Sequence, residues 1–265
     1  MHAGAIPRAP RLDRLGVCME AAQKIRHAVD RVSQLRQASL ATRGLQAAVA
    51  QVKRLQARRF AGTYADLLQG AVYQQAARFF LEELYSDKDY AERDAQFSRI
   101  AGAVQKFFPA QVAATAVALA ELHALTEELD HAMAQAWLLT EDERMTAGSR
   151  YIRAWRATGR RHDRETQLEV VMSIGHELAR LTRTPGLRLM LKMMRAPAAA
   201  AGLDALQRFL ETGFDTFAAL ARHPGRVEAF LDIICGRESA LIAGLFDAEL
   251  VACETALAQT LGQAR

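Results

Sequence analysis

Apolar side chains recur at spacings of three and four residues along nearly the whole chain, which is the periodicity of an amphipathic α-helix. No segment shows the alternation of apolar and polar residues that is typical of a half-buried β-strand. Alanine, the residue with the highest helix propensity, is very frequent, whereas the chain contains only 6 prolines. The sequence therefore predicts an all-α fold, an irregular multi-helix bundle of about ten helices.

Capping residues and prolines indicate where some of these helices begin. Thr63, with Asp66 three residues later, resembles a capping box and predicts a helix that runs to about Tyr85. Pro197 stands where another helix can begin, and we expect that helix to end near Ala221.

Charged residues are distributed in blocks, although the net charge is only +4. Residues 1–60 carry 12 Lys and Arg against 3 Asp and Glu, whereas residues 61–143 carry 5 against 14. Residues 144–195 are again basic, with 12 against 4, and residues 196–265 are acidic, with 5 against 9. This pattern predicts a basic N-terminal tail and helix pair over residues 1–60, and a main helical domain over residues 61–265.

The basic N-terminal segment has two plausible uses for its charge. It can dock on the acidic block that follows it, or it can detach to meet an acidic protein partner or a second copy of the chain. We expect the docking contacts to come from four cations near its end: Lys53, Arg54, Arg58 and Arg59.

Cysteine usage and hydropathy bear on the compartment. Cys18, Cys235 and Cys253 lie far apart and no CxxC pair is present, so neither a disulfide framework nor a zinc ribbon is predicted. The first residues, 1–15, lack the apolar core of a secretory signal. The longest apolar stretch, residues 112–120, is shorter than the roughly 20 residues of a membrane-spanning helix. We therefore expect a cytoplasmic protein without a transmembrane segment.

The most distinctive segment runs from Phe79 to Ile100. The aromatic residues of the predicted helix there point in several directions around its axis. A helix that is apolar on most sides is buried on most sides. We expect Arg78 to lie near the core and to pair with Asp94 or Asp89, because an unpaired buried charge is very costly. This network is either a charged ligand pocket or a structural ion-pair corner, the interpretation that we favour. Its members are Arg78, Tyr85, Asp89, Arg93 and Asp94.

The same segment matches the pattern FFxxxLYxxxDxxxRDxxFxRI from Phe79 to Ile100. In this it resembles an uncharacterised family of bacterial all-helical proteins. The resemblance extends from about Val52 to Phe246, with further matching segments at 121–125, 154–156 and 213–217. It implies an all-helical fold and carries no catalytic residues that can be transferred to this chain.

Histidines offer the candidates for a metal or haem site. Glu128 and His131 form the Glu-x-x-His unit of di-iron bundles, but no other helical histidine has a glutamate three residues before it. On the same predicted helix, His123 and Asp130 lie at one edge of the apolar face, where they can be half-buried. We expect no cofactor. A helical metal- or haem-binding protein, including an oxygen-dependent enzyme, is the alternative hypothesis, with isolated candidates His123, His131 and His176.

Arginines interleaved with Tyr151 and Trp155 form a basic segment. Such a pattern suits binding of phosphates or stacked bases, and it gives three anion-binding candidates: Arg153, Arg156 and Arg160. The modest net charge and the lack of a recognisable nucleic-acid-binding motif argue against nucleic acid as the partner. The competing interpretation is that these arginines pair with the acidic block between residues 61 and 143.

The motifs of common enzymes are missing from the sequence. Neither GxGxxG nor GxxxxGK[ST], which cradle phosphates, is present, and neither is the GxSxG nucleophile elbow. We therefore expect a non-enzymatic helical protein that binds a protein partner or a small anionic ligand.

Overall fold

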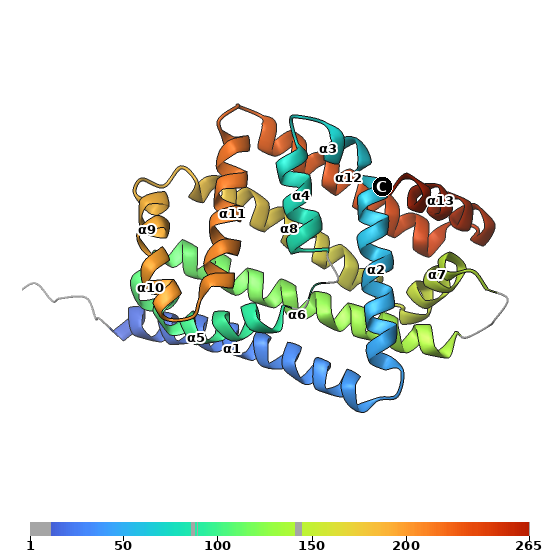
Figure 1. Ribbon diagram of the computed structural model, residues 1–265, viewed down its shortest axis with the longest axis horizontal. Helices are drawn as coiled ribbons and strands as arrows, with labels where there is room; N and C mark the ends of the chain where they lie inside the picture. The colour runs from blue at the N-terminus through green and yellow to red at the C-terminus, as the bar shows by residue number, and fades with distance from the viewer. Residues whose placement is uncertain (1–11, 86–87, 89, 141–144, 265) are drawn as a thin grey trace, which may run out of the picture.

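A computed structural model describes residues 12–85, 88, 90–140 and 145–264, with side chains from residue 21 onward in the first helix. Every regular element among these residues is a helix, which confirms the all-α, multi-helix prediction (Figure 1). In chain order the helices are α1 (Leu12–Ala41), α2 (Leu45–Thr63), α3 (Ala65–Gln69), α4 (Gln74–Glu83), α5 (Ala91–Phe107), α6 (Ala110–Leu139), α7 (Ala147–Thr158), α8 (Arg161–Leu181), α9 (Leu187–Met193), α10 (Arg195–Ala200), α11 (Asp204–Ala221), α12 (Arg226–Asp247) and α13 (Leu250–Gln263).

Two of the expected helices are each broken into a pair. The helix expected from Thr63 to Tyr85 forms α3 and α4, which separate at Gly70, whose backbone is extended. The segment around Pro197 forms α10 and α11, and the connection between them holds Gly202 in the left-handed region, at φ 63°. Glycine reaches that region at little cost because it has no Cβ atom.

Helix α6 forms the centre of the bundle (Figure 1). Helices α1 and α5 pack along it, and α2, α7 and α8 contact it from other directions. Helix α8 in turn carries α11 and α12, and α4 packs on α11. Helices α9 and α10 pack beside α11 at one end of the molecule, while α13 packs against α2 and α7 at the other.

Two large groups of buried side chains hold these helices together. The first lies between α2, α4, α8, α11 and α12, and its buried aromatic residues are Phe60, Tyr64, Phe79, Phe80, Phe217 and Phe230. The second joins α2, α6, α7 and the C-terminal helices around Met133, Trp137, Tyr151 and Ile152. Burying one such side chain stabilises the fold by about 1.5–3 kcal/mol.

The N-terminal helix pair is packed on the rest of the bundle. Ile25 and Val32 of α1 are fully buried against α5 and α6. Helix α2 contributes Val52 and Phe60 to the two large groups of buried side chains. It also runs through the expected domain boundary at residue 60 and ends at Thr63.

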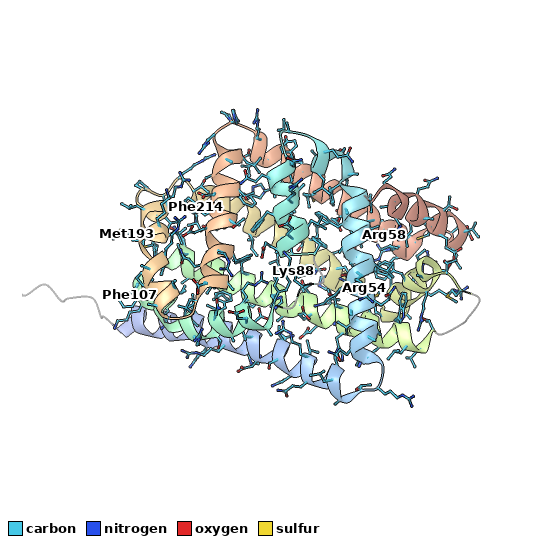
Figure 2. All side chains as sticks on the ribbon, viewed as in Figure 1. Arg54, Arg58, Lys88, Phe107, Met193 and Phe214 are labelled. Carbon is cyan, nitrogen blue, oxygen red and sulfur yellow. The ribbon has the colours of Figure 1, made fainter. Side chains whose placement is uncertain are left out.

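Ion pairs connect this helix pair to the acidic segment that follows it. They are Arg31 with Glu128, Arg36 with Asp94 at 2.6 Å, and Lys53 with Glu127 at 2.5 Å. The other cations expected to make these contacts bond elsewhere: Arg54 to Gln51, Arg58 to the carbonyl oxygen of Leu261, and Arg59 to Glu238. The expectation was wrong for these three. Arg58 and Arg59 reach acceptors on the C-terminal helices α13 and α12, whereas Arg54 bonds to a residue of its own helix, α2, on which Figure 2 labels Arg54 and Arg58.

Candidate ligand-binding cavity

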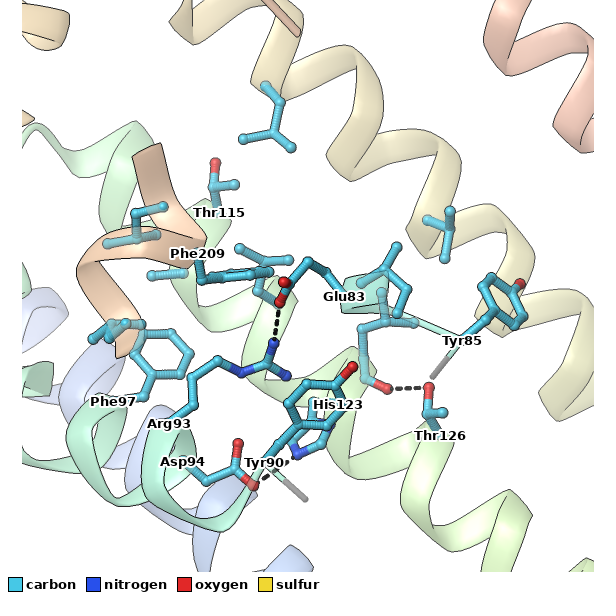
Figure 3. Close-up of a pocket in the computed structure, with 18 of the residues that line it drawn as sticks. Glu83, Tyr85, Tyr90, Arg93, Asp94, Phe97, Thr115, His123, Thr126 and Phe209 are labelled. Atoms are coloured by element: carbon cyan, nitrogen blue, oxygen red, sulfur yellow. Dashed lines mark hydrogen bonds and ion pairs between the residues drawn. The ribbon is translucent and has the colours of Figure 1, made fainter. Parts of the chain in front are cut away.

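A cavity of about 310 Å³ lies inside the bundle, between α5, α6, α8 and α11. Its volume falls within the range of pockets that hold small organic molecules, roughly 300–1,000 Å³. Residues from α2, α4, α7, α9, α10 and α12 complete its wall. Figure 3 shows part of it in close-up.

Helix α6 lines the cavity with a single face that changes character along its length. Residues spaced three and four apart share a face of a helix. In the first half of α6 the lining residues are mostly apolar: Val112, Thr115, Ala116, Leu119 and Leu122. From His123 onward they are polar: His123, Thr126, Glu127 and Asp130.

Helix α8 shows the same gradient and runs in the opposite direction (Figure 1). Its polar lining residues, Arg164 and Gln167, therefore meet the polar half of α6, where Gln167 Nε2 donates to Thr126 Oγ1 at 2.7 Å. Its apolar lining residues, which include Val171 and Leu178, face the same end of the cavity as the apolar half of α6. The cavity consequently has one apolar end and one polar end.

The apolar end, which we call the apolar arm, extends toward α9 and α10. Besides the residues of α6 and α8, its lining includes Phe97 and Val104 from α5, Leu187 and Leu191 from α9, Ala198 from α10, and Leu206, Leu210 and Phe214 from α11. Such a wall favours hydrocarbon over water.

The polar end, which we call the inner polar cluster, comprises Lys53, Gln56, Arg59, Glu127, Asp130, Trp155, Arg164 and Glu238. Arg59 and Glu238 form an ion pair at its base, with Nη1 2.5 Å from Oε1 and both side chains buried. Tyr64 donates its hydroxyl to the same carboxylate oxygen at 2.9 Å. Burial alone would lower the pKa of Arg59, but the Glu238 carboxylate and the neighbouring tyrosines together outweigh it and hold that pKa above its ordinary value.

Two further carboxylates of the cluster come from α6. Glu127 accepts from Lys53 Nζ at 2.5 Å, whereas Asp130 accepts from the side-chain amide of Gln56 at 2.9 Å. Burial raises the pKa of Asp130, and the attraction of Lys53 and Arg164 offsets only part of that effect.

Arg164 stacks on an aromatic ring within the cluster. Its guanidinium carbon lies 4.3 Å from the ring centroid of Trp155, and its Nη1 donates to Gln167 at 3.3 Å. Burial lowers the pKa of this guanidinium, and the charge of Asp130 offsets only part of that effect. Arg164 still carries its charge at neutral pH, because an arginine pKa lies far above that range.

Between the two ends, Arg93 lies between two aromatic rings (Figure 3). Its guanidinium carbon is 3.9 Å from the ring centroid of Tyr90 and 4.6 Å from that of Phe209. Its Nη1 also donates to Glu83 at 3.2 Å. Cation–π contacts of this kind contribute about 0.5–2 kcal/mol, so Arg93 helps to join α4, α5 and α11.

Asp94 joins three helices beside Arg93. One of its carboxylate oxygens is 2.9 Å from His123 Nε2 (Figure 3). The same oxygen is 2.6 Å from Arg36 Nη2. Burial acts to raise the pKa of Asp94, but the hydrogen bonds and charges of His123 and Arg36 outweigh it and hold that pKa below its usual range.

The predicted charge network is thus only partly assembled. Tyr85, Arg93 and Asp94 line the cavity, and Asp89 lies outside the described residues. The expectation that Arg78 lies near the core was wrong, because Arg78 is exposed on α4. Helix α4 buries the face that carries Phe80, and Arg78 points away from that face.

The three candidate histidines lie in different surroundings. His123 contacts Asp94, His131 Nδ1 lies 3.1 Å from Ser39 Oγ, and His176 is exposed on α8. Among the described residues, no group of three or more His, Cys, Asp or Glu side chains is arranged to hold a metal ion.

The three anion-binding candidates do not share a site. Arg153 is exposed on α7. Arg156 donates to carbonyl oxygens at the end of α12, with Nε 2.7 Å from that of Leu245, so it caps that helix. Arg160 pairs with Asp163 at 2.5 Å. Two of the three cations are therefore engaged in contacts that stabilise helix ends and turns.

Sequence reasoning missed the inner polar cluster as a unit. It expected Arg59 to pair with the acidic block, and it gave no role to Glu238. A signal was present in α2, where the buried face marked by Val52 and Phe60 also includes Gln56 and Arg59. Polar residues at core positions of an amphipathic helix indicate a buried polar group that needs a partner.

The fold and the cavity define an all-helical protein with an internal pocket that is apolar at one end and charged at the other. The chain belongs to the family described as Domain of unknown function (DUF8198), whose model matches residues 34–251. No curated protein and no solved structure matches the chain. Within the described part of the chain, no helix has the length and apolar character needed to cross a bilayer.

Proposed function

We propose that this protein is a non-enzymatic, cytoplasmic binder of a small, largely apolar organic molecule, which it holds in the internal cavity. The observation that carries the proposal is the cavity itself, with about 310 Å³ of space and a mostly apolar wall. Apolar cavities in proteins stay dry and take up apolar molecules, because water gains no hydrogen bonds there.

The arrangement of the cavity supports binding rather than chemistry. Its charged residues are largely engaged with one another, as in the pairs Lys53–Glu127 and Arg59–Glu238. Such pairs hold helices in place and give a pocket a fixed shape. A pocket of fixed shape binds with less loss of conformational entropy than one that must first be ordered.

A neutral fluorophore such as aminoanthracene, displaced by dodecanol, tests this proposal. The matched variants are Ala116→Phe, which places a ring in the apolar arm, and Ala114→Phe, which places it on the exposed face of the same helix. We expect saturable binding to the unaltered protein and to Ala114→Phe, and loss of binding in Ala116→Phe. A thermal melt checks that both variants fold, since overpacking costs about 1–3 kcal/mol.

Binding that is unsaturable, or equal in the two variants, would show that the fluorophore does not occupy the cavity, and the proposal would fall.

A further inference from the structure

Two buried hydrogen-bond donors at the polar end of the cavity have no partner. They are Nε of Arg59 and Nε1 of Trp155, whose residues are 3% and 4% exposed. Both residues line the cavity. Buried polar groups in proteins are nearly always hydrogen-bonded, so an unbonded pair beside an internal space calls for an acceptor in that space.

Arg164 adds a third donor group to the same wall. It is 8% exposed and stacks on Trp155, and its one hydrogen bond to another described residue is a long one, to Gln167. No carboxylate within the described ranges lies at ion-pair distance from it, whereas Arg59 and Lys53 each have one. Its guanidinium therefore lacks a direct counter-ion in the site.

Among the described residues, one cation of the cluster is not held directly by a carboxylate. The three cations of the cluster face three carboxylates, of which Glu127 and Glu238 are each held by a cation. The third, Asp130, is held by the amide of Gln56 instead. Arg164 is therefore the cation of the cluster that no described carboxylate holds directly, and burial raises the pKa of Asp130.

We propose that the polar end is a carboxylate-binding site, in which Arg164, Trp155 and Arg59 donate to the head group of an amphipathic monocarboxylic acid of fatty-acid type. The inference rests on the proposed function and specifies its ligand class. The hydrocarbon chain of this acid lies in the apolar arm, between α6 and α8, and points toward α9.

The donors distinguish this ligand from others. All three are N–H groups, which a cationic head group cannot accept from, and a neutral hydroxyl leaves the charge of Arg164 without a counter-ion. Glu127 and Glu238 belong to the same cluster and repel a second negative charge, which disfavours a phosphate dianion. A carboxylate presents two acceptor oxygens in a plane and one charge, which suits a guanidinium stacked on an indole ring.

The shape of the cavity fits a long chain. Its lining on α6 runs from Val112 to Asp130, which corresponds to about 27 Å along the helix axis. The charged lining residues of α6 and α8 are confined to one end of this length, so an unbranched molecule with a single polar end fits in one orientation.

The experiment compares dodecanoate with dodecanol, two ligands of equal chain length, by calorimetric titration of the full chain. Charged hydrogen bonds are strong enough that we expect dodecanoate to bind about tenfold or more tightly. Arg164→Gln should abolish this preference and Trp155→Phe, which keeps a ring and removes the donor, should reduce it. Dodecanol affinity should persist in both variants, which shows that their cavities are folded.

The controls are Arg153→Gln, an exposed cation on α7, and Trp137→Phe, which removes a tryptophan that is as deeply buried as Trp155 but lies outside the cavity wall. Both should keep the preference. Because the chain has 2 tryptophans, Trp137→Phe also leaves Trp155 as the single tryptophan reporter. Its fluorescence should change with dodecanoate in an otherwise unaltered site.

The outcomes separate the two proposals. Failure of dodecanol and aminoanthracene to bind would remove the proposed function and the inference with it. Equal affinities for dodecanol and dodecanoate, or a preference that survives both Arg164→Gln and Trp155→Phe, would overturn the carboxylate site while leaving the apolar pocket in place. Unchanged Trp155 fluorescence on saturation with dodecanoate would also overturn it, because the unbonded donors would then be serving water alone.

Discussion

Replacing the buried Arg59 with methionine should lower the free energy of unfolding more than replacing an exposed arginine with methionine does. Methionine preserves most of the side-chain volume, so the change isolates the loss of charge. The partner that remains is the carboxylate of Glu238, a residue that is only 6% exposed. Glu238 lies on α12, which packs on α8 and α7, so the carboxylate cannot reach water unless α12 moves.

The structure sets the size of this effect. Removing one member of a buried ion pair typically costs about 3–5 kcal/mol, because the other charge stays buried without compensation. The hydroxyl of Tyr64 still donates to Glu238 at 2.9 Å, so we expect the low end, about 3 kcal/mol. Arg59→Met/Glu238→Leu should recover most of the loss, since an apolar pair of similar volume often replaces a buried ion pair without penalty.

Urea denaturation followed by circular dichroism measures this difference. Arg78→Met is the control, because Arg78 is exposed on α4 and its substitution should stay within about 0.5 kcal/mol. If Arg59→Met unfolds at the same urea concentration as Arg78→Met, the Arg59–Glu238 pair does not stabilise the fold, and the reasoning from burial is refuted.

Three further predictions follow from other contacts. Asp130→Asn keeps the acceptor for Gln56 and removes a carboxylate whose pKa is raised by burial, so it should increase the free energy of unfolding at pH 7. The gain should vanish at and below the unfolded-state pKa of about 4, because the carboxyl group of Asp130 is then neutral in both states; unfolding measurements across this pH range check it. Gly62→Ala should destabilise the contact between α2 and α13, because a Cβ atom at this position collides with the carbonyl group of Thr260. Gly236→Ala places a Cβ atom where it meets no neighbour and should stabilise α12. Equal melting temperatures of the two variants would contradict this prediction. Amide hydrogen exchange should be faster in α1 than in α6, and it should become faster in α1 as the salt concentration rises, because partly exposed ion pairs help to attach α1 to the bundle. Equal and salt-independent protection of the two helices would mean that α1 is packed as firmly as α6.

Periodicity was sufficient to predict the helical fold but not the points at which helices break. Spacings of three and four residues persist through Gly70 and Gly202, so the pattern alone reads α3 with α4, and α10 with α11, as single helices. These breaks depend on how neighbouring helices pack, since a glycine within a helical pattern is often tolerated.

The candidate site was predicted in part, and the successful part came from helical projection. Projection placed His123 and Asp130 at one edge of the apolar face of α6, and both line the cavity. Arg78 was misplaced because burial was inferred from the neighbouring aromatic residues rather than from the face of α4 that they occupy. Glu238 had no signal of its own, since its role depends on a contact with Arg59 across 179 positions of sequence.

The block pattern of charge is better explained by this long-range pairing than by an external partner. Cations of α1 and α2 reach carboxylates on α5, α6 and α12, so much of the N-terminal surplus is neutralised within the bundle. Arg164 departs from that rule, because it comes from a basic block and is buried, yet no described carboxylate pairs with it directly. A protein partner cannot reach a guanidinium in that position, whereas a small molecule inside the cavity can. The charge most in need of a counter-ion therefore argues for a ligand within the fold rather than for a surface that binds another protein.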